Sequence, residues 1–169
     1  MGLAALSVLE NLTVTMADLD ETALKTARRN VRRHNHGGRC AVVRADVRLP
    51  APASLGQYDV IACNPPYIPT GDIALLEPSV RDHEPHLALD GGADGLELIR
   101  AVAFQWASAL VPGGALLLEI GIGQAKGVSA ILRQSGFCNL RVHKDSGGIE
   151  RVVEASLPRE PAQAVEKEV

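Results

Sequence analysis

The chain has 169 residues, of which 46% are hydrophobic and 22% charged, the composition of one ordinary globular domain. This composition excludes a disordered chain, a fibrous repeat and a coiled coil. No apolar run reaches the roughly 18 residues that a membrane span needs. The net charge is −3, from 17 basic and 20 acidic residues, so bulk charge does not favour tight binding to nucleic acid.

The first half of the chain alternates helix-like and strand-like segments. Runs rich in β-branched residues predict its strands, and the helix after the first strand has Asp20 as a plausible N-cap. The predicted elements are a helix at residues 1–10, a strand at 12–17, a helix from 20 to the glycine pair at 37–38, and strands at 40–44 and 58–63.

The second half opens with a long stretch at residues 64–95 that proline and glycine interrupt, and irregular segments of this length are usually functional. The predicted elements after it are a helix at 96–110, a strand at 115–120, a helix at 124–134, and strands at 137–142 and 149–155. The alternation predicts an α/β fold with a mainly parallel sheet and an antiparallel C-terminal hairpin at one edge. We expect one domain over residues 1–157 and a flexible polar tail over 158–169.

Three predicted strand ends carry polar side chains in succession: Asp18, Asp46 and Asn64. Ligands of open α/β sheets bind outside the carboxyl ends of the strands. An aspartate such as Asp18 can accept hydrogen bonds from a ribose diol. Asp46, followed by the apolar Val47, offers an acceptor for the amine of adenine and a wall for its ring. Each aspartate alone could equally cap a helix, but the series favours a nucleoside site.

The strongest chemical signal is Asn64-Pro65-Pro66-Tyr67, directly after the strand predicted at residues 58–63. Two consecutive prolines remove two backbone donors and stiffen the loop, which leaves free carbonyl groups. The amide oxygen of Asn64 and the carbonyl of Pro65 can accept the two hydrogens of a planar NH2 group, so that its nitrogen lone pair faces an electrophile. Tyr67 adds a flat face beside them. A rigid structural turn is the alternative interpretation.

Four strings of this chain resemble the S-adenosylmethionine-dependent glutamine methyltransferases that modify peptide-chain release factors. They are DVIACNPPYIP, VRDHEPHLALDGGADGLELIR, LVPGGALLLEIGIGQ and GGIERVV. The resemblance covers residues 4–155. Because N-P-P-Y is shared with adenine-N6 DNA methyltransferases and with ribosomal-protein glutamine methyltransferases, the segment containing Arg81, Glu84 and Pro85 is what narrows the match to the release-factor enzymes.

The resemblance implies a Rossmann-like class I methyltransferase fold, S-adenosylmethionine as cofactor, and methyl transfer to the amide nitrogen of a glutamine in a release factor. It implies that Asp18 binds the cofactor ribose and that Asp46 and Val47 flank its adenine. It places Asn64 between cofactor and substrate, with Pro65, Pro66 and Tyr67 completing the glutamine site. The catalytic residues implied are Asn64, Pro65 and Tyr67. The partner implied is a release factor, with neither a membrane nor direct nucleic-acid binding.

Two parts of that family have no counterpart in this sequence. One is the first strand with its glycine-rich loop, D-x-G-x-G-x-G-like, and the other is a small helical domain ahead of it. We therefore expect the C-terminal catalytic part of such an enzyme, without its first strand and glycine loop. Two alternatives remain open. One is an adenine-N6 methyltransferase of DNA or RNA, which would need a basic groove or a target-recognition segment, and the other is a truncated non-catalytic module.

The sequence does not predict a metal site. His83 and His86 flank Glu84-Pro85, but this spacing differs from H-E-x-x-H and the proline breaks the helix that such a site requires. The three cysteines are too few and too widely spaced for a disulfide framework or a C-x-x-C pair. Free thiols of this kind predict a reducing compartment, here the cytoplasm.

Overall fold

The computed structural model describes residues 1–159, so the predicted tail lies outside the described residues from position 160 onward. The chain divides into two compact units, Met1–Leu49 (the N-terminal unit) and the described chain from Pro50 onward (the C-terminal unit). Within residues 1–159, no helix has the length and apolar character required to cross a bilayer.

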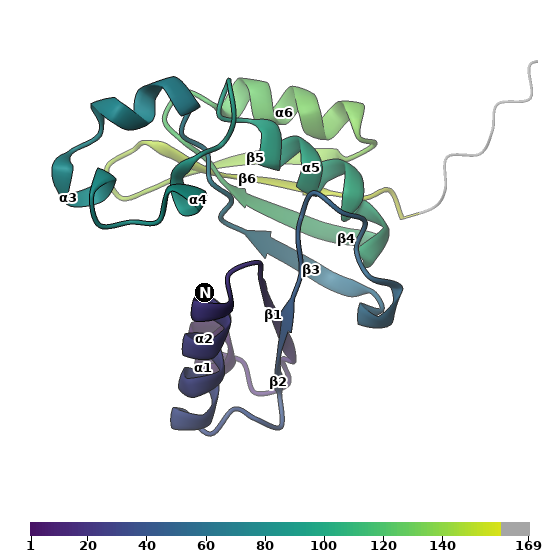
Figure 1. The fold of residues 1–169 in the computed structure, drawn as a ribbon. Helices are drawn as coiled ribbons and strands as arrows, with labels where there is room; N and C mark the ends of the chain where they lie inside the picture. The colour runs from purple at the N-terminus through teal and green to yellow at the C-terminus, as the bar shows by residue number, and fades with distance from the viewer. Residues whose placement is uncertain (160–169) are drawn as a thin grey trace, which may run out of the picture. The chain divides into compact units, whose positions relative to one another are not determined.

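The N-terminal unit contains a two-stranded parallel sheet and two helices (Figure 1). In this sheet Val14 lies opposite Cys40 and Asp18 opposite Arg44. The predicted N-cap is confirmed, because the Asp20 carboxylate accepts a hydrogen bond from the Ala23 backbone N–H at 2.7 Å. The elements of the unit are α1 (Gly2–Val8), β1 (Val14–Asp18), α2 (Glu21–Arg33) and β2 (Cys40–Arg44).

Arg39 joins separate segments of the N-terminal unit. Its guanidinium donates hydrogen bonds to the carbonyl oxygens of Leu6 at 3.0 Å and of Leu9 and Glu10, both at 2.9 Å. The last carbonyls of a helix have no partner within the helix. Arg39 therefore satisfies the C-terminal end of α1 and holds it beside the start of β2.

The C-terminal unit contains a four-stranded sheet in the order β3-β4-β6-β5. β3 and β4 are parallel, whereas β6 is antiparallel to both β4 and β5, so the predicted C-terminal hairpin is confirmed. α5 and α6 lie on the same face of this sheet (Figure 1). The elements are β3 (Tyr58–Cys63), α5 (Glu97–Gln105), β4 (Leu110–Glu119), α6 (Ala125–Gln134), β5 (Cys138–Lys144) and β6 (Glu150–Ser156), with short 3₁₀ helices at Ala53–Leu55 and Ala107–Ala109.

The core of the C-terminal unit lies between its sheet and these two helices. Side chains from the central strands β4 and β6 meet apolar residues of α5 and α6, and all of them are essentially inaccessible to solvent. The largest are Ile99, Val102, Leu116, Leu118, Ile120, Val128, Leu132 and Val153. The alternation of apolar residues along β4 thus places one face of this strand in the core.

Three predicted boundaries are wrong, and one predicted loop contains helices. The helix predicted from 20 to the glycine pair at 37–38 ends at Arg33. The helix predicted at 96–110 ends at Gln105, and the strand predicted at 115–120 begins at Leu110. Tyr58 pairs with Leu110 and Val60 with Ala115, so residues 111–114 form a bulge in β4. The stretch predicted as irregular contains a 3₁₀ helix and two short α-helices, at Thr70–Leu75, α3 (Pro78–Arg81) and α4 (His86–Leu89).

Candidate functional site

The N-P-P-Y segment leaves the carboxyl end of β3, beside the end of the parallel strand β4. Asn64 is exposed, whereas Pro65 is buried. Within residues 1–159, neither the Asn64 side chain nor the Pro65 carbonyl takes part in a hydrogen bond. Both oxygens are therefore available as acceptors at one edge of the sheet.

Three glycines surround Tyr67 closely enough to exclude any side chain. A Cβ atom at Gly91 would lie 2.8 Å from the Tyr67 Cα, and one at Gly121 would lie 3.1 Å from the Tyr67 ring. A Cβ at Gly95 would collide with the Tyr67 carbonyl oxygen, and Gly95 also has a φ of +72°, which disfavours other residues. The backbone and ring of Tyr67 are thus packed directly against main chain.

Gln124 connects the end of β4 to this segment. Its Oε1 accepts a hydrogen bond from the Gly121 backbone N–H at 2.8 Å. Its Nε2 donates to the Tyr67 carbonyl at 2.8 Å and to the Gly95 carbonyl at 3.3 Å. One half-buried side chain therefore links three segments of the C-terminal unit.

The residues after Tyr67 pair with the glycine-rich stretch at residues 89–92. The Ile68 N–H donates to the Leu89 carbonyl at 3.1 Å, and the Gly91 N–H donates to the Ile68 carbonyl at 2.8 Å. The Thr70 hydroxyl donates to the Asp90 carboxylate at 2.7 Å, and this bond lowers the pKa of Asp90. The loop that follows N-P-P-Y is therefore fixed to the rest of its unit on the side of Tyr67.

Asp18 and Asp46 lie at the carboxyl ends of β1 and β2 in the N-terminal unit. The Asp18 carboxylate is exposed, and its Oδ1 accepts a hydrogen bond from the Asp20 N–H at 2.8 Å. The Ala45 N–H donates to the Asp18 carbonyl at 3.0 Å, which continues the β1–β2 pairing toward Asp46. The parallel pair thus brings the two predicted nucleoside-binding aspartates to the same edge of their sheet.

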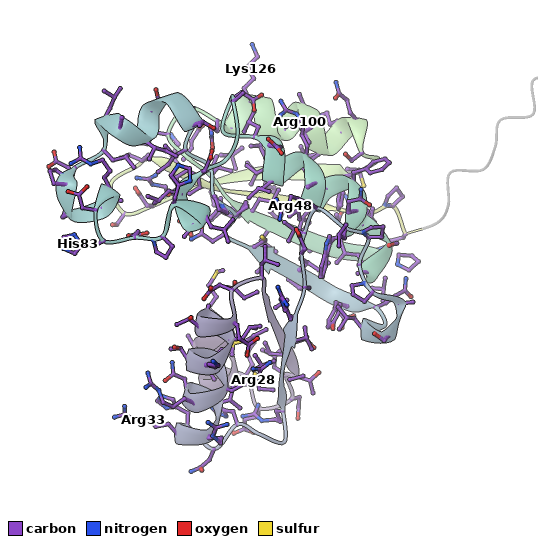
Figure 2. The ribbon with its side chains drawn as sticks, in the orientation of Figure 1. Arg28, Arg33, Arg48, His83, Arg100 and Lys126 are labelled. Carbon is purple, nitrogen blue, oxygen red and sulfur yellow. The ribbon has the colours of Figure 1, made fainter. Side chains whose placement is uncertain are left out.

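The Asp46 carboxylate forms a bidentate ion pair with Arg48, which is labelled in Figure 2. The Arg48 side chain donates to Oδ1 at 2.9 Å and to Oδ2 at 2.7 Å. These bonds lower the pKa of Asp46, so the carboxylate is ionised at neutral pH. Val47 is half-buried beside it. The Arg48 backbone N–H also donates to Oδ1 at 3.0 Å, and Nε makes a second contact with Oδ2 at 3.2 Å. These bonds occupy the roughly four acceptor positions of the carboxylate.

The structure groups the predicted site residues within each unit: Asp18, Asp46 and Val47 in one, and Asn64 to Tyr67 in the other. The predicted site residues did not include those that hold Tyr67, namely Gly91, Gly95, Gly121 and Gln124. The density of glycine at 91–95 was a usable signal, since glycines at fixed offsets often permit close backbone contacts. Within residues 1–159, no group of three or more His, Cys, Asp or Glu side chains is arranged to hold a metal ion.

The sequence matches the family model "Methyltransferase small domain" over residues 1–93. It is 43% identical over 131 residues to a release factor glutamine methyltransferase of Geobacter sulfurreducens, covering 78% of this chain and 45% of that protein. It is 39% identical over 154 residues to one of Gloeobacter violaceus, covering 90% of this chain and 53% of that protein. The chain thus spans about half the length of the curated relatives it matches.

Solved methyltransferase structures share the fold. A methyltransferase from Pyrococcus furiosus superposes with a TM-score of 0.64 at 18% identity, covering 94% of this chain and 68% of that one. The S-adenosylmethionine-dependent methyltransferase SibL superposes with a TM-score of 0.61 at 18% identity, covering 94% of this chain and 47% of that one. These likenesses confirm the predicted α/β fold of the class I methyltransferases, with parallel strands and an antiparallel C-terminal hairpin.

Proposed function

Because this chain belongs to the methyltransferase small domain family, we propose that it transfers a methyl group from S-adenosylmethionine to a glutamine side chain of a peptide chain release factor. The observation that carries the proposal is the N-P-P-Y segment, which presents two free acceptors, Asn64 and Pro65, beside a Tyr67 that is held by main chain. Release factor glutamine methyltransferases are the relatives found at about 40% identity over most of the chain, which supports the same assignment.

The acceptors of the N-P-P-Y segment suit a primary amide. We assign the Asn64 Oδ1 and the Pro65 carbonyl to the two hydrogens of the glutamine NH2 group. An amide nitrogen is a poor nucleophile because its lone pair is delocalised into the carbonyl. Acceptors on both hydrogens increase the electron density on nitrogen, and fixed geometry aims the lone pair. Pro66 and Tyr67 complete the walls that hold the amide plane.

The N-terminal unit carries the residues that fit the nucleoside of the cofactor. Asp18 keeps a carboxylate oxygen, Oδ2, that has no hydrogen-bond partner within residues 1–159, as a ribose diol would require. We assign Asp46 and Val47 to the adenine amine and ring, with Arg48 giving up one of its bonds to the Asp46 carboxylate when the amine binds. When bound, S-adenosylmethionine supplies an electrophilic methyl group on a sulfonium. No residue of this chain is assigned as a general base, since the nitrogen becomes acidic once it is methylated.

The free state of all three cysteines fits a reducing environment, and we place the reaction in the cytoplasm. The competing assignment is an adenine-N6 methyltransferase acting on nucleic acid. The net charge of −3 disfavours it, because a surface that grips phosphates needs a basic excess.

The test measures the transfer of radiolabelled methyl groups from S-adenosylmethionine to release factor and to DNA, side by side. We expect label on a glutamine of the release factor and none on DNA. Asn64→Ala should lower turnover by roughly 10²-fold or more, because it removes one of the two acceptors, while calorimetric binding of S-adenosylmethionine changes little. Asn11→Ala, at an exposed position of the N-terminal unit, is the matched control. Label in DNA at a comparable rate would establish the competing assignment.

A further inference from the structure

Gln124 occupies the N-cap position of α6, yet its side chain does not cap the helix. Glutamine is not among the residues preferred there, since Asn, Asp, Ser and Thr make the capping bond more readily. The side chain instead extends away from its helix, toward Tyr67, a residue 57 positions earlier in the chain. A helix that needs only a start would be served better by a shorter side chain, so the reason for glutamine lies in the contact with Tyr67.

The hydrogen bonds of this contact require an amide. Gly121 presents a backbone N–H, which needs an acceptor, whereas Tyr67 and Gly95 present carbonyl oxygens, which need a donor. Only a side chain with one acceptor and one donor at the same carbon satisfies both kinds of partner. A glutamate of the same shape would keep the bond from Gly121 but would place a charged oxygen against two carbonyl oxygens.

The three glycines make the position of Tyr67 sensitive to this bridge. Tyr67 packs against the backbone of Gly91, Gly95 and Gly121 with no side chain between them. Main-chain contacts of this kind set how closely the segments approach, but they do not fix how the segments slide along one another. The backbone bonds of Ile68 constrain the segment after Tyr67, and the bond from Gln124 adds a directional constraint at the Tyr67 carbonyl itself.

We propose that Gln124 is a positioning residue for methyl transfer, which fixes the Tyr67 carbonyl and thereby the geometry of the acceptors at Asn64 and Pro65. The inference rests on the proposed function for the reaction itself, but the bridge also has a structural consequence that is measurable without cofactor. A misplacement of the order of 1 Å at a reacting group can cost about 10²-fold in rate. Loss of the bridge should therefore lower kcat more than it changes KM.

The experiment compares Gln124→Ala and Gln124→Glu with Gln134→Ala. Gln134 is the last residue of α6 and is exposed, so it offers the same chemical change on the same helix away from Tyr67. Lys126→Ala is a second control, because Lys126 points outward from α6 (Figure 2). Each variant is assayed for kcat and KM on release factor, for cofactor affinity by calorimetry, and for backbone hydrogen exchange at residues 67–70 and 91–95 without cofactor.

We expect both Gln124 variants to lower kcat by about 10- to 100-fold with KM and cofactor affinity within about threefold of the wild type. Exchange at residues 67–70 should accelerate in the same two variants, and both controls should match the wild type. Unchanged kcat and unchanged exchange in Gln124→Glu would overturn the inference. A wild-type protein that methylates no glutamine would refute the proposed function, and the exchange data would still decide whether Gln124 holds Tyr67.

Discussion

The two units of the chain are stabilised in different ways. Among the described residues, the C-terminal unit buries seventeen apolar side chains, whereas the N-terminal unit buries three, Leu6, Leu24 and Val31. The N-terminal sheet has two strands, and two strands alone are marginally stable in water. This unit therefore depends heavily on polar links such as those of Arg39 and Asp20. The proposed nucleoside-binding aspartates thus lie on the weakly supported unit and the proposed glutamine site on the firmly packed one.

Hydrogen exchange gives the most direct test of this comparison. We expect backbone amides of β1 and β2 to exchange by about 10³-fold faster than those of β4 and β6, because a small core permits local opening while the larger core opens only on global unfolding. Exchange followed by mass spectrometry on the cofactor-free protein measures both sheets together. Equal protection in the two sheets would mean that the units unfold as one, and it would contradict the difference in stability between them.

Truncation of one buried leucine in each unit should show how much each core contributes to stability. Leu118→Ala in β4 should lower the free energy of unfolding of the C-terminal unit by about 2–5 kcal/mol, because it leaves a cavity at a fully buried position. Trp106 is the single tryptophan and is buried in this unit, so its fluorescence during urea unfolding reports that loss.

Leu24→Ala is the counterpart in α2, also at a fully buried position. It should accelerate exchange in β1 and β2 while leaving the Trp106 transition within about 0.5 kcal/mol of the wild type, since Leu24 and Trp106 belong to different compact units. A shift of the Trp106 transition as large as that of Leu118→Ala would contradict two separate cores.

Removal of the polar link in the N-terminal unit should have a smaller effect. Arg39→Ala leaves the carbonyl groups at the end of α1 without their donor, at a cost of about 1–3 kcal/mol to that unit. Exchange in α1 is the measurement. Arg39→Lys should recover only part of the loss, because one ammonium does not present the planar fork of a guanidinium. The exposed Arg29→Ala in α2 serves as the control and should change little.

The last expected effect concerns Cys63 at the end of β3, where burial raises the pKa of the thiol to about 11. The folded state therefore favours the protonated thiol more strongly than the unfolded state, whose thiol pKa is about 8.5. This contribution to stability is complete below pH 8.5 and is lost as the pH rises toward 11. A pKa difference of this size corresponds to about 3 kcal/mol. The difference between wild type and Cys63→Ala in urea unfolding from pH 8 to pH 10.5 measures it, and a difference that does not vary with pH would contradict it.

Local sequence signals predicted the strands well and the long-range contacts poorly. The strands at 40–44 and 58–63 were predicted with the bounds that the structure gives, because β-branched runs end there at turn-forming residues. The start of β4 was wrong because Pro112, Gly113 and Gly114 suggest a turn, whereas pairing with β3 at Leu110 keeps them in the strand as a bulge. The bridge from Gln124 to Tyr67 spans 57 positions and depends on tertiary packing, which no local pattern encodes.

The glycines around Tyr67 also determine which positions of the proposed amide pocket tolerate substitution. A side chain at Gly91 or Gly95 would push the Tyr67 backbone out of place, and one at Gly121 would crowd the Tyr67 ring, so a library built on this scaffold would keep all three unchanged. Pro66 and Tyr67 are only half-buried, and replacing their side chains leaves the contacts of the Tyr67 backbone with Gly91 and Gly95 in place. Diversity introduced at these two positions would thus alter the shape of the proposed amide pocket while inheriting its framework, which makes them the natural starting points for selecting new acceptors.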